Sequence, residues 1–191
     1  ALLLRSTELE PDYYVFSNLG AIYQYEKQDQ KAAEMYERAL RMRATDYRVW
    51  INFASIYSGL PLPEAREKAA AAFDTAIVLA ERTRKINPHD PLLLVHLADC
   101  YDKRGNHTEA LTLARQAIQT APGVQEVLVR AAIVFESNGD RDQALSLLGR
   151  AIEKGYSPSQ IRSVDEFRAL VADERFERIV RLPAPTGDKP K

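Results

Sequence analysis

The chain has 191 residues, with 26 Lys and Arg against 27 Asp and Glu, which gives a formal net charge of -1. This balance lacks the basic excess with which nucleic-acid-binding proteins neutralise phosphates. The single cysteine excludes an internal disulfide framework and leaves the compartment open. No run of apolar residues approaches the length of about eighteen that a membrane-spanning helix needs. We therefore expect a protein that binds no nucleic acid and does not insert into a membrane.

Residues 1–12 carry several leucines ahead of Pro11, a residue that cannot continue a helix. From Tyr13 onward one pattern recurs four times, over 13–46, 47–90, 91–124 and 125–158. We expect 1–12 to be the tail of a preceding partial repeat of this pattern, and the protein to extend upstream of Ala1.

Each copy has a large apolar residue, an apolar–small pair three residues later, an aromatic residue three further on, and then a second group of small residues. This spacing places one stripe on each of two successive helices, and the small residues let the two helices pack closely as an antiparallel pair. In the first copy these residues are Phe16, Leu19, Gly20 and Tyr23, followed by Ala32, Tyr36 and Ala39. Their counterparts include Ala54, Tyr57 and Phe73, then Ala98, Tyr101 and Ala114, then Ala132, Phe135 and Leu148.

The copies differ at their turns. The third and fourth have Gly105 and Gly139 between their helices, which is typical of a turn that leads into a capped helix. The first has Lys27 there, which predicts a weaker turn. The second copy is longer than the others, because of a proline-rich turn over 58–63 and a second helix that we expect to gain about two turns.

The end of the chain predicts two further segments. Ser157 and Pro158 favour a helix start, and apolar residues such as Phe167, Leu170 and Phe176 follow at amphipathic spacing. We expect 159–181 to form a helical cap, which a repeat array needs at its end. Residues 182–191 contain three prolines and no aromatic residue, which predicts a disordered tail.

These residues and their spacing resemble the 34-residue signature of the tetratricopeptide repeat (TPR) family. The resemblance implies an all-α fold, a right-handed α-α superhelix closed by the cap, in which the first helix of each repeat lines a concave groove. It also implies a scaffold that binds a partner protein or peptide in this groove. The segment from Glu153 to Arg178 is similar to the ends of such regions in bacterial multidomain regulators, some with kinase or cyclase domains. This leaves a regulatory or self-association module as the alternative.

The sixth residue of each copy is polar and lies beside an apolar stripe: Asn18, Asn52, His96 and Arg130. The family resemblance implies that Asn at this position hydrogen-bonds the backbone of a bound peptide, and an amide can both donate and accept. The alternative is a set of solvated side chains on a helix face. The predicted peptide-groove residues are Tyr14, Asn18, Arg48, Asn52, Val95, His96, Asp99 and Arg130.

Some members of the family clamp a terminal carboxylate with Lys, Arg and Asn side chains in the groove. Here Ser17, Ala21, Leu92 and His96 occupy the positions where most of those side chains would lie. The charge of the predicted groove is mixed, so we expect no strongly charged ligand.

The sequence offers little for catalysis. His96, Asp99 and Asp102 share a helix face at spacings of three, but no Cys or His ligand motif accompanies them. Such trios are common on exposed faces. We interpret Cys100 as a packed thiol and His107 as a solvated side chain in a turn. The sequence therefore predicts no enzyme activity, no cofactor and no metal site.

Overall fold

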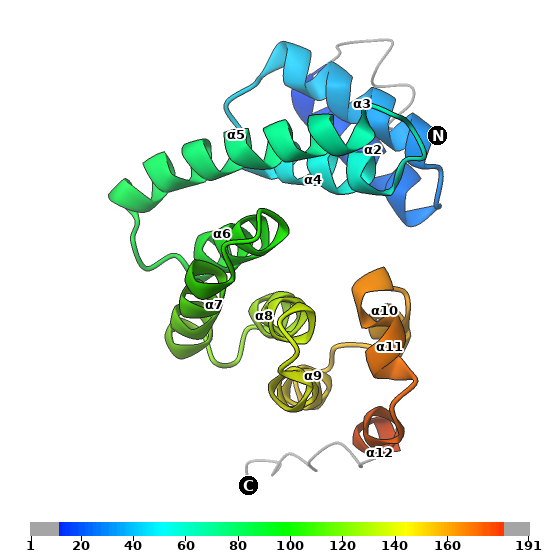
Figure 1. Cartoon of the computed structure of the whole chain (residues 1–191), viewed down its shortest axis with the longest axis vertical. Coiled ribbons are helices and arrows are strands. Elements are labelled where there is room, and N and C mark those ends of the chain that lie inside the picture. The colour runs from blue at the N-terminus through cyan, green and yellow to red at the C-terminus, as the bar shows by residue number, and fades with distance from the viewer. Residues whose placement is uncertain (1–11, 182–191) are drawn as a thin grey trace, which may run out of the picture. The chain divides into compact units, whose positions relative to one another are not determined.

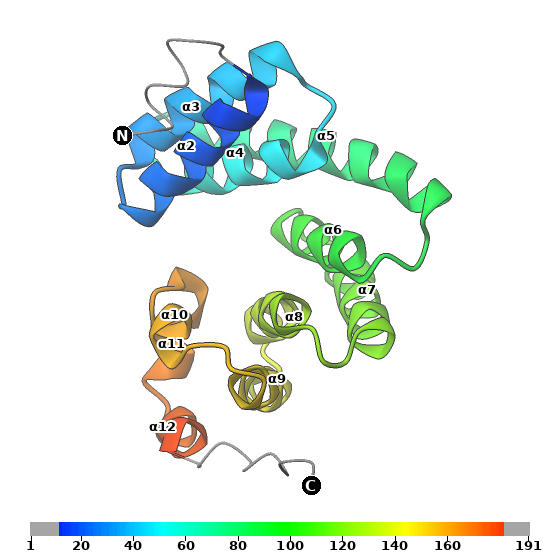
Figure 2. The same cartoon turned by 180° about the vertical axis from the view of Figure 1, so that it is seen from behind.

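A computed structural model describes residues 12–181, and every regular element in this range is helical (Figures 1 and 2). The predicted helix tail before Pro11 and the predicted disordered tail 182–191 lie outside the described residues. The all-α class is confirmed. The first eight helices are α2 (Tyr13–Tyr25), α3 (Asp29–Met42), α4 (Tyr47–Gly59), α5 (Ala65–Ile86), α6 (Pro91–Lys103), α7 (His107–Thr120), α8 (Gln125–Ser137) and α9 (Arg141–Glu153).

The described chain divides after Ile86 into two compact units, which we call unit 1 (12–86) and unit 2 (87–181). In unit 1, α2 packs on α3 and α4 packs on α5. The contact between α3 and α4 joins these two pairs. In unit 2, α6 packs on α7 and α8 packs on α9, while α6 and α7 both contact α8. The repeat pattern alone does not predict this division.

Close helix packing in the first pair of unit 1 depends on Gly20. A Cβ atom at this position would lie 2.7 Å from the ring of Tyr36, which is closer than real Cβ contacts come. Tyr36 is fully buried, and its hydroxyl donates a hydrogen bond to Gln24 at 3.1 Å. The ring of Tyr36 therefore has little room to move, and a residue larger than glycine at position 20 would collide with it.

In three of the four helix pairs the turn between the helices has a left-handed backbone, and only the longer turn between α4 and α5 has none. Gly105 and Gly139 have φ of 80° in this turn, and Lys27 has φ of 57° at the corresponding place in unit 1. A residue with a Cβ is disfavoured in this region, whereas glycine is not. The weaker turn expected at Lys27 thus has a physical basis.

Short polar side chains cap the starts of α6, α7 and α9 in unit 2, whereas α8 starts after Val124 without a side-chain cap. The Asp90 carboxylate accepts hydrogen bonds from the backbone N–H groups of Leu92 and Leu93. Asn106 and Asp140 do the same for the starts of α7 and α9. Each cap satisfies a backbone donor that the helix cannot, which fixes where the helix begins.

Four short elements follow α9: α10 (Pro158–Arg162), the 3-10 turn η1 (Asp165–Phe167), α11 (Arg168–Val171) and α12 (Glu174–Arg181). η1 packs on α8 and α12 packs on α9. Four large apolar side chains of this segment are fully buried, namely Ile161, Phe167, Leu170 and Phe176. Residues 158–181 therefore cover the end of the last helix pair.

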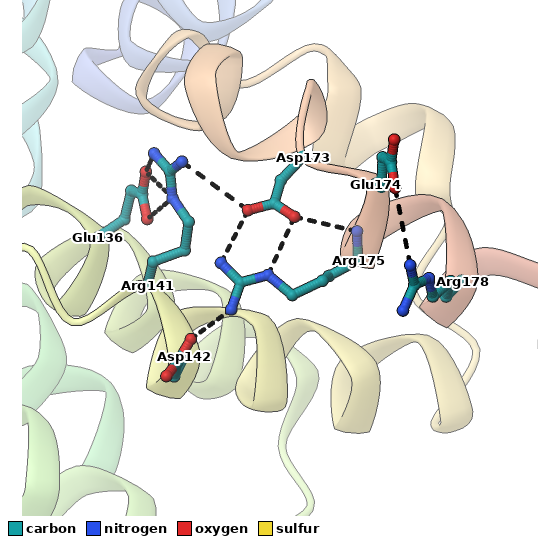
Figure 3. A network of polar contacts seen from close by, with 7 residues as sticks. All are labelled: Glu136, Arg141, Asp142, Asp173, Glu174, Arg175 and Arg178. Atoms are coloured by element: carbon teal, nitrogen blue, oxygen red, sulfur yellow. Dashed lines mark hydrogen bonds and ion pairs between the residues drawn. The ribbon is translucent and has the colours of Figure 1, made fainter.

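A polar network fastens α12 to the start of α9 (Figure 3). Arg141 pairs with Glu136 at 2.5 Å and lies 3.9 Å from Asp173. Arg175 donates to Asp173 at 2.8 Å and also pairs with Asp142. Hydrogen bonds from Arg175 hold the pKa of the Asp173 carboxyl well below its usual range.

Candidate functional site

Two of the predicted groove residues, Asn18 and Asn52, lie on the first helices of unit 1, α2 and α4. These helices contact each other. Asn18 is exposed and Asn52 is half-buried. Within residues 12–181 neither side-chain amide makes a hydrogen bond, so their donors and acceptors are available to a ligand.

Tyr14 and Arg48, the other predicted residues of unit 1, differ in freedom. Tyr14 is 51% exposed, and its ring centroid lies 4.0 Å from that of Tyr13, with the two ring planes tilted by 37°. Arg48 donates two hydrogen bonds from its guanidinium to Asp46, at 3.0 and 2.8 Å. Asp46 also caps α4 through the backbone N–H of Arg48. Arg48 is thus tied to its own helix start, whereas about half of the Tyr14 side chain is open to solvent.

In unit 2 the corresponding polar residues are paired. The Nε atom of Arg130 donates to Glu126 at 2.9 Å, one turn earlier on α8. Nε2 of His96 lies 3.9 Å from the same carboxylate, and His96 is only 8% exposed. The structure therefore joins these two predicted residues through Glu126, which connects α6 to α8.

Val95 differs from the expectation. Its side chain is fully buried, so it belongs to the core rather than to a surface that a peptide could reach. Every residue of α6 from Leu93 to Ala98 is buried, because α7 and α8 both pack on this helix. We leave Val95 out of the proposed site.

The trio of His96, Asp99 and Asp102 is not an exposed cluster. Asp102 is buried, and its carboxylate accepts hydrogen bonds from Ser137 and Asn138 at the end of α8, both at 2.6 Å. Nδ1 of His107 lies 2.9 Å from the same carboxylate, so His107 is anchored although its side chain stays 59% exposed. Asp102 therefore ties α6, α7 and α8 together. Within residues 12–181 no group of three His, Cys, Asp or Glu side chains is arranged to hold a metal ion.

Asp99 lies on α6 between two cations, Lys103 and Arg130. Burial raises the pKa of its carboxyl, although both cations act against the shift. Burial alone would lower the pKa of Lys103, but the charges of Asp99 and Glu166 outweigh it and raise this pKa. Lys103 also donates a hydrogen bond to Glu166 of η1 at 3.1 Å.

An open pocket of about 390 Å³ lies next to this charged surface. Its apolar wall comes from α8 and from the segment after α9, and the ion pair of Glu126 and Arg130 forms part of its rim. The lining residues are Glu126, Val129, Arg130, Ile133, Tyr156 and Val164. The repeat pattern did not indicate Tyr156 or Val164 as site residues, because both lie after α9, outside the paired helices.

Cys100 is fully buried, and burial raises the pKa of its thiol well above the usual range. The thiolate that nucleophilic chemistry needs is therefore disfavoured. Among the described residues no helix is both long and apolar enough to cross a bilayer.

The helix pairs with their small-residue stripes define a repeat scaffold, and sequence comparison identifies its family. The chain belongs to the tetratricopeptide repeat family: residues 15–46, 68–114 and 103–164 match family profiles described as tetratricopeptide repeat. Domains of this family generally mediate protein–protein interactions, and none of the matched segments belongs to a catalytic domain. A comparison with curated proteins finds no significantly similar relative.

Solved structures with similar folds include TTC0263, a thermophilic TPR protein of Thermus thermophilus. It matches with a TM-score of 0.61 and 18% identity, over 89% of this chain and 88% of that one. BtubC from P. vanneervenii matches with a TM-score of 0.49 and 20% identity, over 82% and 72% of the two chains. YrrB, described as a TPR protein with an unusual peptide-binding site, has a TM-score of 0.39 and 16% identity, over 84% and 96%. The likeness to TTC0263 supports the fold of an array of helix pairs.

Proposed function

We propose that the chain binds an extended segment of a partner protein, and that Asn18 and Asn52 hydrogen-bond the backbone of this segment. The observation that carries the proposal is that both side chains occupy the same place on two contacting helices and make no hydrogen bond within residues 12–181. An amide that is not engaged by its own fold can pair with a peptide group, whatever the neighbouring side chain of the ligand is.

The surroundings of the two amides suit such a ligand. Tyr14, one turn before Asn18 on α2, offers a half-exposed ring that can cover an apolar side chain of the partner. Arg48 is neutralised by Asp46, so it adds little net charge to this face. A face of uncharged amides and an aromatic ring favours binding over catalysis, and we propose no enzymatic activity for the chain.

The test has two steps. The chain is first used as bait to recover a partner from cells of the organism that makes it, and binding of the purified partner is then measured. Calorimetry should show that the combined variant Asn18→Ala and Asn52→Ala binds the purified partner about tenfold more weakly, because two hydrogen bonds of roughly 1 kcal/mol each are partly replaced by water. The melting temperature should stay nearly unchanged, since neither amide supports the fold.

Gln30→Ala provides the matched control. Gln30 is an exposed amide on α3, the second helix of the same pair, and should not affect binding. If the combined variant both binds more weakly and melts at a clearly lower temperature, the two asparagines are structural. Unchanged binding would place the partner on another surface.

Self-association is the second candidate, and it rests on a stripe along α2. Tyr14, Ile22 and Tyr25 are 51%, 41% and 84% exposed and follow one another at helical spacing. Exposed apolar side chains that share one helix face favour contact with another protein surface. Light scattering of the purified chain over a range of concentrations separates the two candidates, because a constant monomer mass contradicts self-association.

A further inference from the structure

The charged side chains around Asp99 in unit 2 are not balanced. The carboxylates of Asp99, Glu126 and Glu166 are accompanied by two cations, and Asp102, held by its own hydrogen bonds, adds a further negative charge. Each cation has a close partner other than Asp99: Arg130 pairs with Glu126 at 2.9 Å, and Lys103 pairs with Glu166 at 3.1 Å. Within residues 12–181 Asp99 makes neither a hydrogen bond nor an ion pair, so one negative charge is left without direct compensation.

The position of Asp99 makes this charge costly for unit 2 itself. Burial raises the pKa of the carboxyl despite the two nearby cations, so the fold disfavours the ionised form. An acid with a raised pKa in the folded state lowers stability at neutral pH, and the loss is relieved as the pH falls through that pKa. An energetically unfavourable charge of this kind is more often kept for binding than for folding.

An apolar receptor lies next to the charge. Arg130, which lies within electrostatic reach of Asp99, also lines the pocket formed with Val129, Ile133 and Tyr156. At about 390 Å³ this open pocket has room for one large apolar side chain and part of the backbone that carries it. A carboxylate and an apolar pocket that share Arg130 present two different anchors to one ligand.

We propose that unit 2 recognises a peptide segment that carries a Lys or Arg side chain next to a large apolar residue. The basic side chain pairs with Asp99, and the apolar side chain enters the pocket of Val129, Ile133 and Tyr156. This inference rests on the proposed function, since it names the class of peptide that unit 2 selects. The argument for a basic side chain is charge complementarity. Among the described residues the carboxylate of Asp99 has no paired cation, and an acidic segment would be repelled by Glu126 and Glu166.

The experiment is a selection of short random peptides displayed on phage, with the purified full chain as target. Peptides retained by the wild-type chain should be enriched in Lys or Arg beside Leu, Ile, Phe or Tyr. A synthetic copy of a selected peptide should bind Asp99→Asn about tenfold more weakly than wild type, as expected for the loss of one charge-assisted contact. Replacing the basic residue of the peptide with Gln should have the same effect, and the two losses should not add.

Two controls separate recognition from a damaged fold. Glu153→Gln removes an exposed carboxylate at the end of α9 and should bind the peptide as the wild-type chain does. Asp99→Asn should melt at the same temperature as wild type or slightly higher, because it removes a charge that the folded state disfavours. A structural role for Asp99 predicts a lower melting temperature instead.

The possible results distinguish this inference from the proposed peptide-binding function on which it rests. Selected peptides without basic enrichment, or a selected peptide that binds Asp99→Asn as tightly as wild type, would overturn the inference and leave peptide binding intact. Retention of no peptide at all would overturn both.

Discussion

Unit 1 and unit 2 differ most clearly at the twelfth residue of each repeat, near the end of the first helix. Unit 1 has neutral side chains there: Gln24 accepts a hydrogen bond from Tyr36, and Ser58 donates to the backbone of its own helix. Unit 2 has the carboxylates of Asp102 and Glu136, whose side chains are only 6% and 9% exposed. Asp102 collects donors from two other helices, and Glu136 holds Arg141.

The difference shows that one apolar pattern supports two ways of fixing neighbouring helices. Unit 1 combines close apolar contact, with Gly20 against the ring of Tyr36, with one hydrogen bond from Tyr57 of α4 to Glu37 of α3. Unit 2 adds buried charges, which stabilise only while each has its full set of partners. Trp50 of α4, the single tryptophan of the chain, lies in unit 1, so its fluorescence reports on that unit while circular dichroism reports on both.

The largest effect should come from Asp102→Ala. The substitution leaves three donors without their acceptor and should lower the free energy of unfolding of unit 2 by about 3 kcal/mol. In urea, the circular dichroism transition should then begin at lower concentration while the fluorescence transition of Trp50 stays in place. Ser58→Ala at the equivalent position of unit 1 should cost roughly 0.5 kcal/mol, since its hydroxyl bonds only within its own helix. A shift of both signals together would show that the two units unfold as one.

Gly20→Ala should affect unit 1 in a similar way but less strongly. The added methyl group meets a buried ring, and overpacking of this kind costs about 2 kcal/mol. Here the fluorescence of Trp50 should report the earlier transition. Gly59→Ala is the matched control, because a Cβ atom there would have no neighbour within 4 Å. If Gly20→Ala were neutral, the close approach of Tyr36 would not be limiting.

The smallest effect concerns the turn within each helix pair, and it can be measured in both directions. Lys27→Gly should raise the stability of unit 1 by about 1 kcal/mol, because glycine adopts the left-handed backbone without a steric penalty. Gly139→Lys should lower the stability of unit 2 by a similar amount, since no atom crowds that position and only the backbone conformation matters. Thermal unfolding would show midpoint shifts of a few degrees with opposite signs. Shifts of the same sign would mean that contacts of the lysine side chain outweigh the backbone.

The sequence predicted the features that follow from the repeat, because they depend on residues close together in the chain. The facing small and large residues, such as Gly20 and Tyr36, are set by helix spacing, and the turn residues are set by backbone geometry. The Asp102 contacts were missed because spacing along α6 shows which residues share a face but not which neighbours they meet. Its partners Ser137 and Asn138 are 35 and 36 residues away, about one repeat along the chain.

The candidate site was predictable only in part for the same reason. Asn18 and Asn52 were chosen from their place in the repeat, and their role in binding stays a prediction. Val95 was misplaced because position in the repeat does not reveal that the adjoining helices cover it. Tyr156 joins the pocket from a loop, where no helix period guides the expectation.

The length of α5 also bears on how such a chain can change over evolutionary time. Its last buried residue is Ala80, yet the helix continues to Ile86, so the final turns contribute no side chain to the core of unit 1. Gain or loss of residues at this point removes no fully buried side chain. We therefore expect the chains of close relatives to vary in length after Ala80 more readily than within any of the other helix pairs.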